Sequence, residues 1–317
     1  MHTERFGISS KLQEVLCLLA QERVFEESEE ILQSLLGVEI SAKQIQRLSE
    51  YYGGELEKLE DDYQNNTLDV PLVDHDRNDE LVYVTLDGSM VYTREDGWKE
   101  MKVGRIYSEN ARVSIQEKRT EITDSVYVCT LGNNKEFFRK FEPYIDPYKR
   151  TIFIADGAKW IWNWVENSYG DSIQILDFYH AVEKLGAYAT LAYKDVGERR
   201  QWLEEHKQRL KADEVEKVVE ELKNTPVQTS EGEKALNDVI RYYESNMDRM
   251  KYGTFMKKGY LIGSGAIESA HRNVIQQRLK LSGQRWSIYG AQTIANLRAY
   301  KKGNRWNTLI QQIKKAA

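Results

Sequence analysis

The chain has 317 residues, of which 41 % are hydrophobic and 30 % are charged, and its formal net charge at pH 7 is −5. This composition is typical of a soluble globular protein that is long enough for two domains, or for one domain with a large insertion. It excludes a membrane-spanning class, because no apolar stretch has the length needed to cross a bilayer, and a disulfide framework, because Cys17 and Cys129 are the only cysteines. With no signal-peptide pattern at the start, we expect a cytoplasmic protein without a membrane partner.

The charge is unevenly distributed along the chain. Residues 251–317 contain 13 Lys and Arg residues and one acid, Glu268, for a local charge of +12, whereas the other 250 residues carry 32 bases and 49 acids, for −17. This asymmetry favours a basic surface for a polyanion such as nucleic acid. The alternative is a solvated helical face that the acidic part of the same chain balances.

Residues 1–75 are predicted to be helical. Two apolar stripes with helical spacing are centred on Leu16 and Leu32, and Gly37 is expected to end the second helix. Ser41 and Gln44 then fit a capping box at the start of a third helix. The acidic stretch Glu55–Arg77 is interpreted as a linker.

A helix, a short turn and a capped helix are the outline of a helix-turn-helix. In that arrangement the third helix is the recognition helix, and Lys43, Gln44 and Arg47 would bind DNA near its start. An ordinary small helical bundle fits the same pattern equally well.

Residues 76–180 are predicted to form a mixed sheet with helices packed on it. An Asp96-Gly97 hairpin, a strand over Ser125–Leu131 and a helix over Asn134–Tyr144 belong to this part. Three apolar runs, typical of strands buried on both faces, each end at an aspartate: residues 81–86 at Asp87, residues 151–155 at Asp156 and residues 172–176 at Asp177.

The chain then changes character. Charged helices without strands fill residues 181–255, which we interpret as an α-helical insertion. Residues 256–317 return to the sheet-containing domain and are basic. There the turn Gly263-Ser264-Gly265 leads into a helix that has Glu268 in its first turn.

Two strand-end aspartates and a glutamate at the start of a late helix suit two-metal phosphoryl transfer. Carboxylate oxygens bridge hard divalent cations, and nearby Lys and Arg hold the phosphodiester. Each acid also has a simpler interpretation: an Asp before Gly often begins a turn, and a Glu early in a helix favours the helix dipole.

Several motifs resemble the DDE class of bacterial insertion-sequence transposases, closest to the ISKra group and its Mutator-related branch. The resemblance covers roughly residues 81–300. It rests on Leu86-Asp87-Gly88-Ser89, Ala155-Asp156-Gly157-Ala158, Asp177-Phe178-Tyr179-His180, Gly263-Ser264-Gly265-Ala266-Ile267-Glu268, Gln277-Arg278-Leu279-Lys280 and Ser282-Gly283-Gln284-Arg285-Trp286.

The resemblance implies an RNase H-like catalytic domain interrupted by a helical insertion. It makes Asp87, Asp156 and Glu268 the catalytic ligands of two Mg²⁺ or Mn²⁺ ions. Asp177 and His180 match a motif that lies near the active site in the Mutator-related branch and aids DNA handling or strand transfer. His180 is therefore a further catalytic candidate, placed at a phosphate or at the leaving 3′-oxygen; the alternative is a hydrogen-bonded structural histidine. The expected partners are double-stranded DNA, at element ends and target, and further copies of the chain, with the protein on the nucleoid when bound.

Four basic residues after Glu268 are further candidates for phosphate contacts: Arg272, Arg278, Lys280 and Arg285. Trp286 is interpreted as a core residue. Two other functions use the same residues. One is a non-catalytic DNA-binding protein, and the other is an RNase H-like nuclease that cuts nucleic acid without strand transfer.

Overall fold

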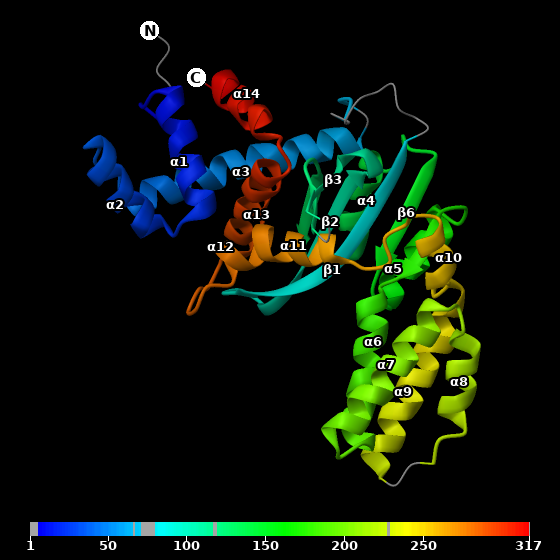
Figure 1. Cartoon of the computed structure of the whole chain (residues 1–317). Coiled ribbons are helices and arrows are strands. Elements are labelled where there is room, and N and C mark those ends of the chain that lie inside the picture. Colours follow the sequence, from blue (N-terminus) through cyan, green and yellow to red (C-terminus); the bar gives the residue numbers. More distant parts are fainter. Residues whose placement is uncertain (1–5, 66, 71–79, 117–118, 227–228, 317) are drawn as a thin grey trace. The chain divides into compact units, whose positions relative to one another are not determined.

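A computed structural model describes residues 6–65, 67–70, 80–116, 119–226 and 229–316 (Figure 1). The chain divides into two compact units: unit 1 comprises Met1–Thr151 and Ala266–Ala317, and unit 2 comprises Ile152–Gly265. The fold is α/β, as predicted, with antiparallel strands in unit 1 and a parallel pair in unit 2. The N-terminal helices fall in unit 1. The expected domain boundary at residues 75 and 76 lies outside the described residues.

Three helices begin unit 1: α1 (Ser10–Glu22), α2 (Phe25–Leu36) and α3 (Ala42–Gln64). The predicted capping box is confirmed, since Ser41 accepts from the Gln44 backbone and the Gln44 side chain accepts from the Ser41 backbone. Gly37 ends α2 in the left-handed conformation, at φ 63°, as predicted.

The predicted linker from Glu55 is wrong over its first part, because α3 continues to Gln64. Leu56, Leu59 and Tyr63 keep the helical spacing and are buried, so packing extends the helix through an acidic sequence.

Helices α1 and α3 pack against α13 (Ile288–Lys302), which crosses α3 (Figure 1). The approach is close: a Cβ on Gly53 would lie 2.3 Å from the Thr293 carbonyl oxygen. Only glycine fits at this crossing. Because α3 and α13 approach so closely, the N-terminal helices share a core with the C-terminal ones.

The sheet of unit 1 has the order β5-β2-β1, all antiparallel: β1 (Leu81–Thr93), β2 (Gly97–Ser108) and β5 (Val126–Leu131). Gly97 makes the predicted hairpin turn at φ 69°. The helix predicted after β5 is α4 (Asn134–Phe141) followed by a short 3₁₀ turn. A second hairpin, β3 (Arg112–Gln116) with β4 (Arg119–Ile122), was not predicted.

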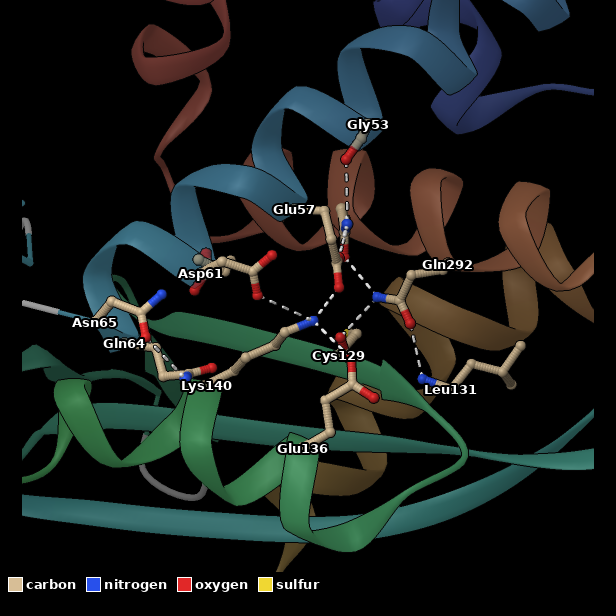
Figure 2. A network of polar contacts seen from close by, with 12 residues as sticks. Gly53, Glu57, Asp61, Gln64, Asn65, Cys129, Leu131, Glu136, Lys140 and Gln292 are labelled. Atoms are coloured by element: carbon tan, nitrogen blue, oxygen red, sulfur yellow. Dashed lines mark hydrogen bonds and ion pairs between the residues drawn. The ribbon is translucent and has the colours of Figure 1, made fainter. Parts of the chain in front are cut away.

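A polar network joins α3, α4, α13 and β5 within unit 1 (Figure 2). The Gln292 side chain accepts from the Leu131 N–H at 2.8 Å and donates to the Cys129 carbonyl at 2.9 Å, which satisfies part of the β5 edge. Lys140 is buried between Glu57 and Glu136. Burial alone would lower the pKa of Lys140, but these carboxylates outweigh it and raise the pKa, so the ammonium stays charged.

Unit 2 pairs β6 (Arg150–Ala155) with β7 (Ile173–Leu176) in parallel, and α5 (Lys159–Ser168) connects them. A helical part follows, as predicted for residues 181–255, and α6, α7 and α9 lie side by side (Figure 1). Its helices are α6 (Phe178–Ala192), α7 (Val196–Lys211), α8 (Val215–Lys223), α9 (Ser230–Asn246) and α10 (Tyr252–Lys257).

The return to unit 1 is helical. After α11 (Gly265–Ala270), a π-helical turn at His271–Gln276 leads into α12 (Gln277–Leu279), α13 and α14 (Trp306–Ala316). Within the described part of the chain, no helix combines the length and apolar character needed to span a membrane.

Candidate functional site

Asp87 lies within a strand and not at its end, which corrects the sequence-based expectation. Strand β1 continues to Thr93, paired with β2, and Asp87 stands opposite Val103. What ends before Asp87 is burial: Val82–Leu86 are buried, whereas the Asp87 side chain is 38 % exposed. Its Oδ1 accepts a hydrogen bond from the Gly88 N–H at 2.7 Å. The apolar run therefore marked the limit of burial, while pairing with β2 carries the strand further.

His271 faces Asp87, a contact that the sequence analysis did not predict. The His271 Nε2 lies 3.2 Å from Asp87 Oδ2, and the histidine is buried. Among the described residues, neither ring nitrogen of His271 has a partner in hydrogen-bond geometry, so the contact is one of ion-pair distance only. The sequence carries no local signal for this contact, because the two residues lie far apart in the chain.

Glu268 belongs to the helical segment that His271 joins to β1. It is exposed in the first turn of α11, three residues before His271, in the same continuous helical segment. Unit 1 thus carries two of the three predicted carboxylates. The π-helical turn that starts at His271 is a geometry found often at functional sites.

Asp156 directly follows β6 in unit 2, as predicted. Its Oδ1 accepts from the Ala158 N–H at 3.0 Å, and its carbonyl accepts from the Trp162 indole N–H at 2.6 Å. A Cβ on Gly157 would meet the Tyr242 ring at 2.1 Å, so the residue after Asp156 has to be glycine. Burial, together with the charge of Asp156, raises the pKa of Tyr242, which therefore remains a neutral phenol.

Asp177 is fully buried at the start of α6. Its Oδ1 accepts from the His180 N–H at 2.7 Å as the helix cap, and its Oδ2 accepts from the Ser264 N–H. Burial alone would raise the pKa of Asp177, but the hydrogen bonds from His180 and Ser264 outweigh it and lower the pKa. The carboxylate thus joins the β7–α6 turn to the glycine-rich turn before Glu268, and it is not accessible to a DNA phosphate.

His180 is partly exposed, with Nδ1 3.3 Å from Asp177 Oδ1. Of the two residues in the predicted motif, it is the one whose side chain a ligand can reach. Asp177 also accepts the backbone N–H of His180, so the carboxylate contacts both the ring and the main chain of this residue.

No group of three or more His, Cys, Asp or Glu side chains within the described ranges is arranged to hold a metal ion. The chemistry of the donors nevertheless fits a hard divalent cation, because Asp87 and Glu268 offer carboxylate oxygens that solvent reaches. Asp87 and Glu268 belong to unit 1 and Asp156 to unit 2.

The predicted DNA-contacting residues of α3 are exposed near its start. Lys43 donates to Gln46 at 3.1 Å, and the Gln44 side chain is engaged in the capping box. A groove of about 880 Å³ beside them, between α2 and the start of α3, is lined by four glutamates: Glu26, Glu29, Glu30 and Glu39. Their charge opposes DNA on that side, which leaves Lys43 and Arg47 as the available cations.

The four basic candidates after Glu268 fall into two groups. Arg272, Lys280 and Arg285 are exposed. Arg278 is buried: its Nε donates to the Ala20 carbonyl at 2.9 Å, and its guanidinium lies 4.7 Å from the ring centroid of Trp286. Burial lowers the pKa of Arg278 to about 10, so it stays charged at neutral pH. Trp286 is a core residue, as predicted.

The chain was compared with protein-family models and with curated proteins, and no family model and no curated protein matches it. Functional inference therefore rests on the residues themselves.

Proposed function

We propose that this chain is a DNA transposase of the DDE type with an RNase H-like catalytic fold. Asp87, Asp156 and Glu268 are its metal ligands, and its substrates are the ends of a DNA element and the target DNA. It acts as a homo-oligomer on paired ends.

The observation that carries this proposal is the contact between His271 and Asp87. It draws the helical segment of Glu268 to the strand of Asp87, although about 180 residues separate the two acids in the sequence. Solvent reaches both carboxylates, so a cation can reach them as well. In unit 2, Asp156 follows a buried strand and lies on a backbone that its own hydrogen bonds and Gly157 hold in place.

Two divalent ions, when bound, would supply Lewis-acid activation of the attacking oxygen and stabilisation of the leaving oxygen. Asp87, Asp156 and Glu268 would hold them. Arg272, Lys280 and Arg285 bind the phosphates on either side of the cleaved bond, and His180 contacts the phosphate or the leaving 3′-oxygen.

The reaction has two displacements at phosphorus. In the first, water forms the new P–O bond, the bond to the 3′-oxygen breaks, and that oxygen leaves with a proton as a 3′-hydroxyl. In the second, this hydroxyl attacks a phosphodiester of the target, and the target's own 3′-oxygen is displaced.

The test is Mg²⁺-dependent nicking of a supercoiled plasmid by the full chain and by Asp156→Asn. We expect the variant to bind DNA as the wild type does and to lose nicking by at least 10²-fold, because one metal-holding carboxylate is gone. Undiminished nicking by the variant would contradict the proposal.

A non-catalytic DNA-binding protein is the second candidate. The exposed cations Lys43 and Arg47 near the start of α3, which the proposed phosphoryl transfer does not use, favour it. DNA binding that weakens steeply with salt, with no cleavage at any Mg²⁺ or Mn²⁺ concentration, would establish it. A nuclease without strand transfer would instead release nicked products and leave the target DNA unjoined.

A further inference from the structure

The outer part of the β1–β2 hairpin exposes aromatic side chains. Trp98 is 63 % exposed, and Tyr92, its partner across the ladder, is 36 % exposed. Their rings meet edge to face with centroids 5.4 Å apart. Met90, two residues before Tyr92 and hence on the same face, is also exposed, whereas Val91 and Thr93 on the opposite face are buried. One face of the hairpin therefore anchors it, and the aromatic face is open to solvent.

The segment after α12 holds this hairpin in place. Thr93 bridges to Trp286, the Arg94 N–H donates to the Trp286 carbonyl at 2.8 Å, and the Trp286 N–H donates to the Tyr92 carbonyl at 3.3 Å. Lys280 Nζ donates to Ser89 Oγ at 3.2 Å. All of these residues belong to unit 1, and Figure 1 shows the orange loop after α12 beside the end of β1. The most basic part of the sequence is thus attached to the aromatic hairpin.

The charged side chains around Tyr92 and Trp98 favour binding of an anion. The Arg285 guanidinium lies 5.9 Å from the Tyr92 ring centroid, and Arg285, Arg94 and Lys280 are all exposed. The nearby acids are engaged within the protein: Asp96 with Lys99 at 2.5 Å, Glu100 with Lys102 at 2.8 Å, and Glu95 with the Ile288 N–H at 3.1 Å. Glu95 keeps its negative charge, because an N–H does not neutralise a carboxylate, so Arg94, Lys280 and Arg285 exceed the remaining acid by two charges. Arg285 lies against the Tyr92 ring.

We propose that Tyr92 and Trp98 form a stacking platform for unpaired nucleobases, with Arg285 binding an adjoining phosphate. Every base has a π-face that stacks on an aromatic side chain, and cations beside the rings match the backbone of the same strand. In an intact duplex the base faces are covered by their neighbours, so the ligand is a single strand or a frayed strand end. The inference rests on the proposed function only in taking nucleic acid as the ligand.

The experiment measures binding of a fluorescein-labelled single-stranded DNA of about 12 nucleotides to the full chain by fluorescence anisotropy. We expect Trp98→Ala to weaken binding about 5- to 150-fold, the range for losing one base–aromatic stack. Trp98→Phe keeps a ring and stays within about threefold of wild type. Trp98→Leu keeps an apolar side chain without a ring and weakens binding as Trp98→Ala does.

Two controls accompany these variants. Ile115→Ala removes an exposed apolar side chain from the other hairpin of unit 1 and leaves the affinity unchanged. A duplex with both ends closed by covalent linkers, which has no unpaired bases, binds the wild type and Trp98→Ala equally.

The proposal is overturned if Trp98→Ala binds the single strand as the wild type does, or if Trp98→Leu restores wild-type affinity. It is also overturned if Trp98→Ala instead dissociates an oligomer while single-strand binding is unchanged, which would assign the face to a second copy. Loss of single-strand binding in Trp98→Ala together with an inactive nicking assay would leave the platform standing and remove the transposase proposal. If the wild type nicks DNA and Trp98→Ala binds the single strand as the wild type does, the transposase proposal stands and the stacking platform is removed.

Discussion

Asp177 illustrates how a single buried carboxylate can organise the surroundings of a candidate site. It caps α6 through the His180 N–H and holds the Ser264 N–H of the turn that precedes α11. Hydrogen bonds to a charged acceptor are roughly twice as strong as neutral ones. The one from Ser264 is buried and the one from His180 is partly buried. The aspartate therefore matters first for the conformation of two turns.

We predict that Asp177→Asn destabilises the protein by about 2 kcal/mol at pH 7, because the amide offers one acceptor where the carboxylate offers two. The pKa of Asp177 is lowered from its ordinary value of 3.8, so its contribution is present above pH 3.8 and is lost as the pH falls through the lowered pKa. Urea unfolding of both proteins from neutral to acidic pH should show the gap between them closing below pH 3.8. A gap that does not change with pH would contradict this account.

His271 is expected to act as a positioning residue for Asp87. We predict that His271→Ala lowers nicking about 10- to 100-fold and raises the Mg²⁺ concentration needed for half-maximal activity, as losses of a ligand's outer partner do. The Mg²⁺ dependence is the decisive readout, because a merely structural loss would not move it. His206→Ala removes an equally buried histidine from α7 and is the matched control. If His206→Ala shifts the Mg²⁺ dependence and His271→Ala does not, the positioning role of His271 is contradicted.

At the scale of elements, buried arginines hold α1 against the C-terminal helices. Arg298 is fully buried and donates to the Val274 carbonyl at 2.7 Å and to the carbonyls of Gln21 and Asn273. Gln21, like the Ala20 that Arg278 contacts, lies in the last turn of α1, where carbonyls lack helical partners. The positive charges also favour that helix end through its dipole.

We predict that Arg298→Met destabilises the protein by about 3–5 kcal/mol, because it removes donors from several buried carbonyls at once. Lys302→Ala is the matched control: it breaks a surface ion pair with Glu22 at 3.2 Å and should cost less than about 1 kcal/mol. Urea unfolding followed by circular dichroism measures both. Equal effects of the two substitutions would contradict a special role for the buried guanidinium.

These elements also show what could be predicted from sequence and what could not. Gly37, Ser41 and Gln44 act through local geometry, and their effects on helix ends were predicted correctly. The length of α3 depends on burial of Leu56 and its neighbours against other helices, which no local pattern reveals. The same holds for Arg278. Its positive charge suggested a phosphate contact, but the side chain is buried inside unit 1.

The candidate site was predictable in part for the same reason. The places of Asp156 and Asp177 directly after β6 and β7 follow from the apolar runs before them, as the sequence indicated. The partnership of Asp87 with His271 joins residues far apart in the chain, and nothing in the local sequence of either one encodes it. Likewise, the sequence does not reveal that the Asp177 carboxylate is buried. Its place is explained by the hydrogen bonds that it accepts from the N–H groups of His180 and Ser264, and these are visible only in the structure.

At the scale of the whole molecule, burial of some basic residues lowers the positive charge that residues 251–317 present at the surface. Of the 13 basic residues in 251–317, Arg278, Arg298 and Arg305 are buried. Arg305 pairs with the buried Glu60 at 3.3 Å, so its charge is neutralised inside the protein. The surface available to a polyanion is consequently less basic than the local charge of +12 indicates.

Salt dependence of DNA binding separates the two groups of basic residues. Each phosphate contact in a duplex contributes about 0.9 to the slope of log K against log salt concentration. We predict that the triple variant Arg272→Ala, Lys280→Ala, Arg285→Ala reduces the slope by close to 3, since each of these exposed cations would release one counterion on binding. Anisotropy titrations of a labelled duplex over a series of salt concentrations measure it.

Arg278 provides the control for this measurement. Arg278→Met, or Arg278→Lys where the first variant fails to fold, should leave the slope unchanged, because a guanidinium bound to the Ala20 carbonyl releases no counterion when DNA binds. A slope that falls by about one in the Arg278 variant would mean that its side chain leaves the core to reach DNA. An unchanged slope in the triple variant would place the polyanion surface elsewhere on the chain, with Lys43 and Arg47 of α3 as the next residues to test.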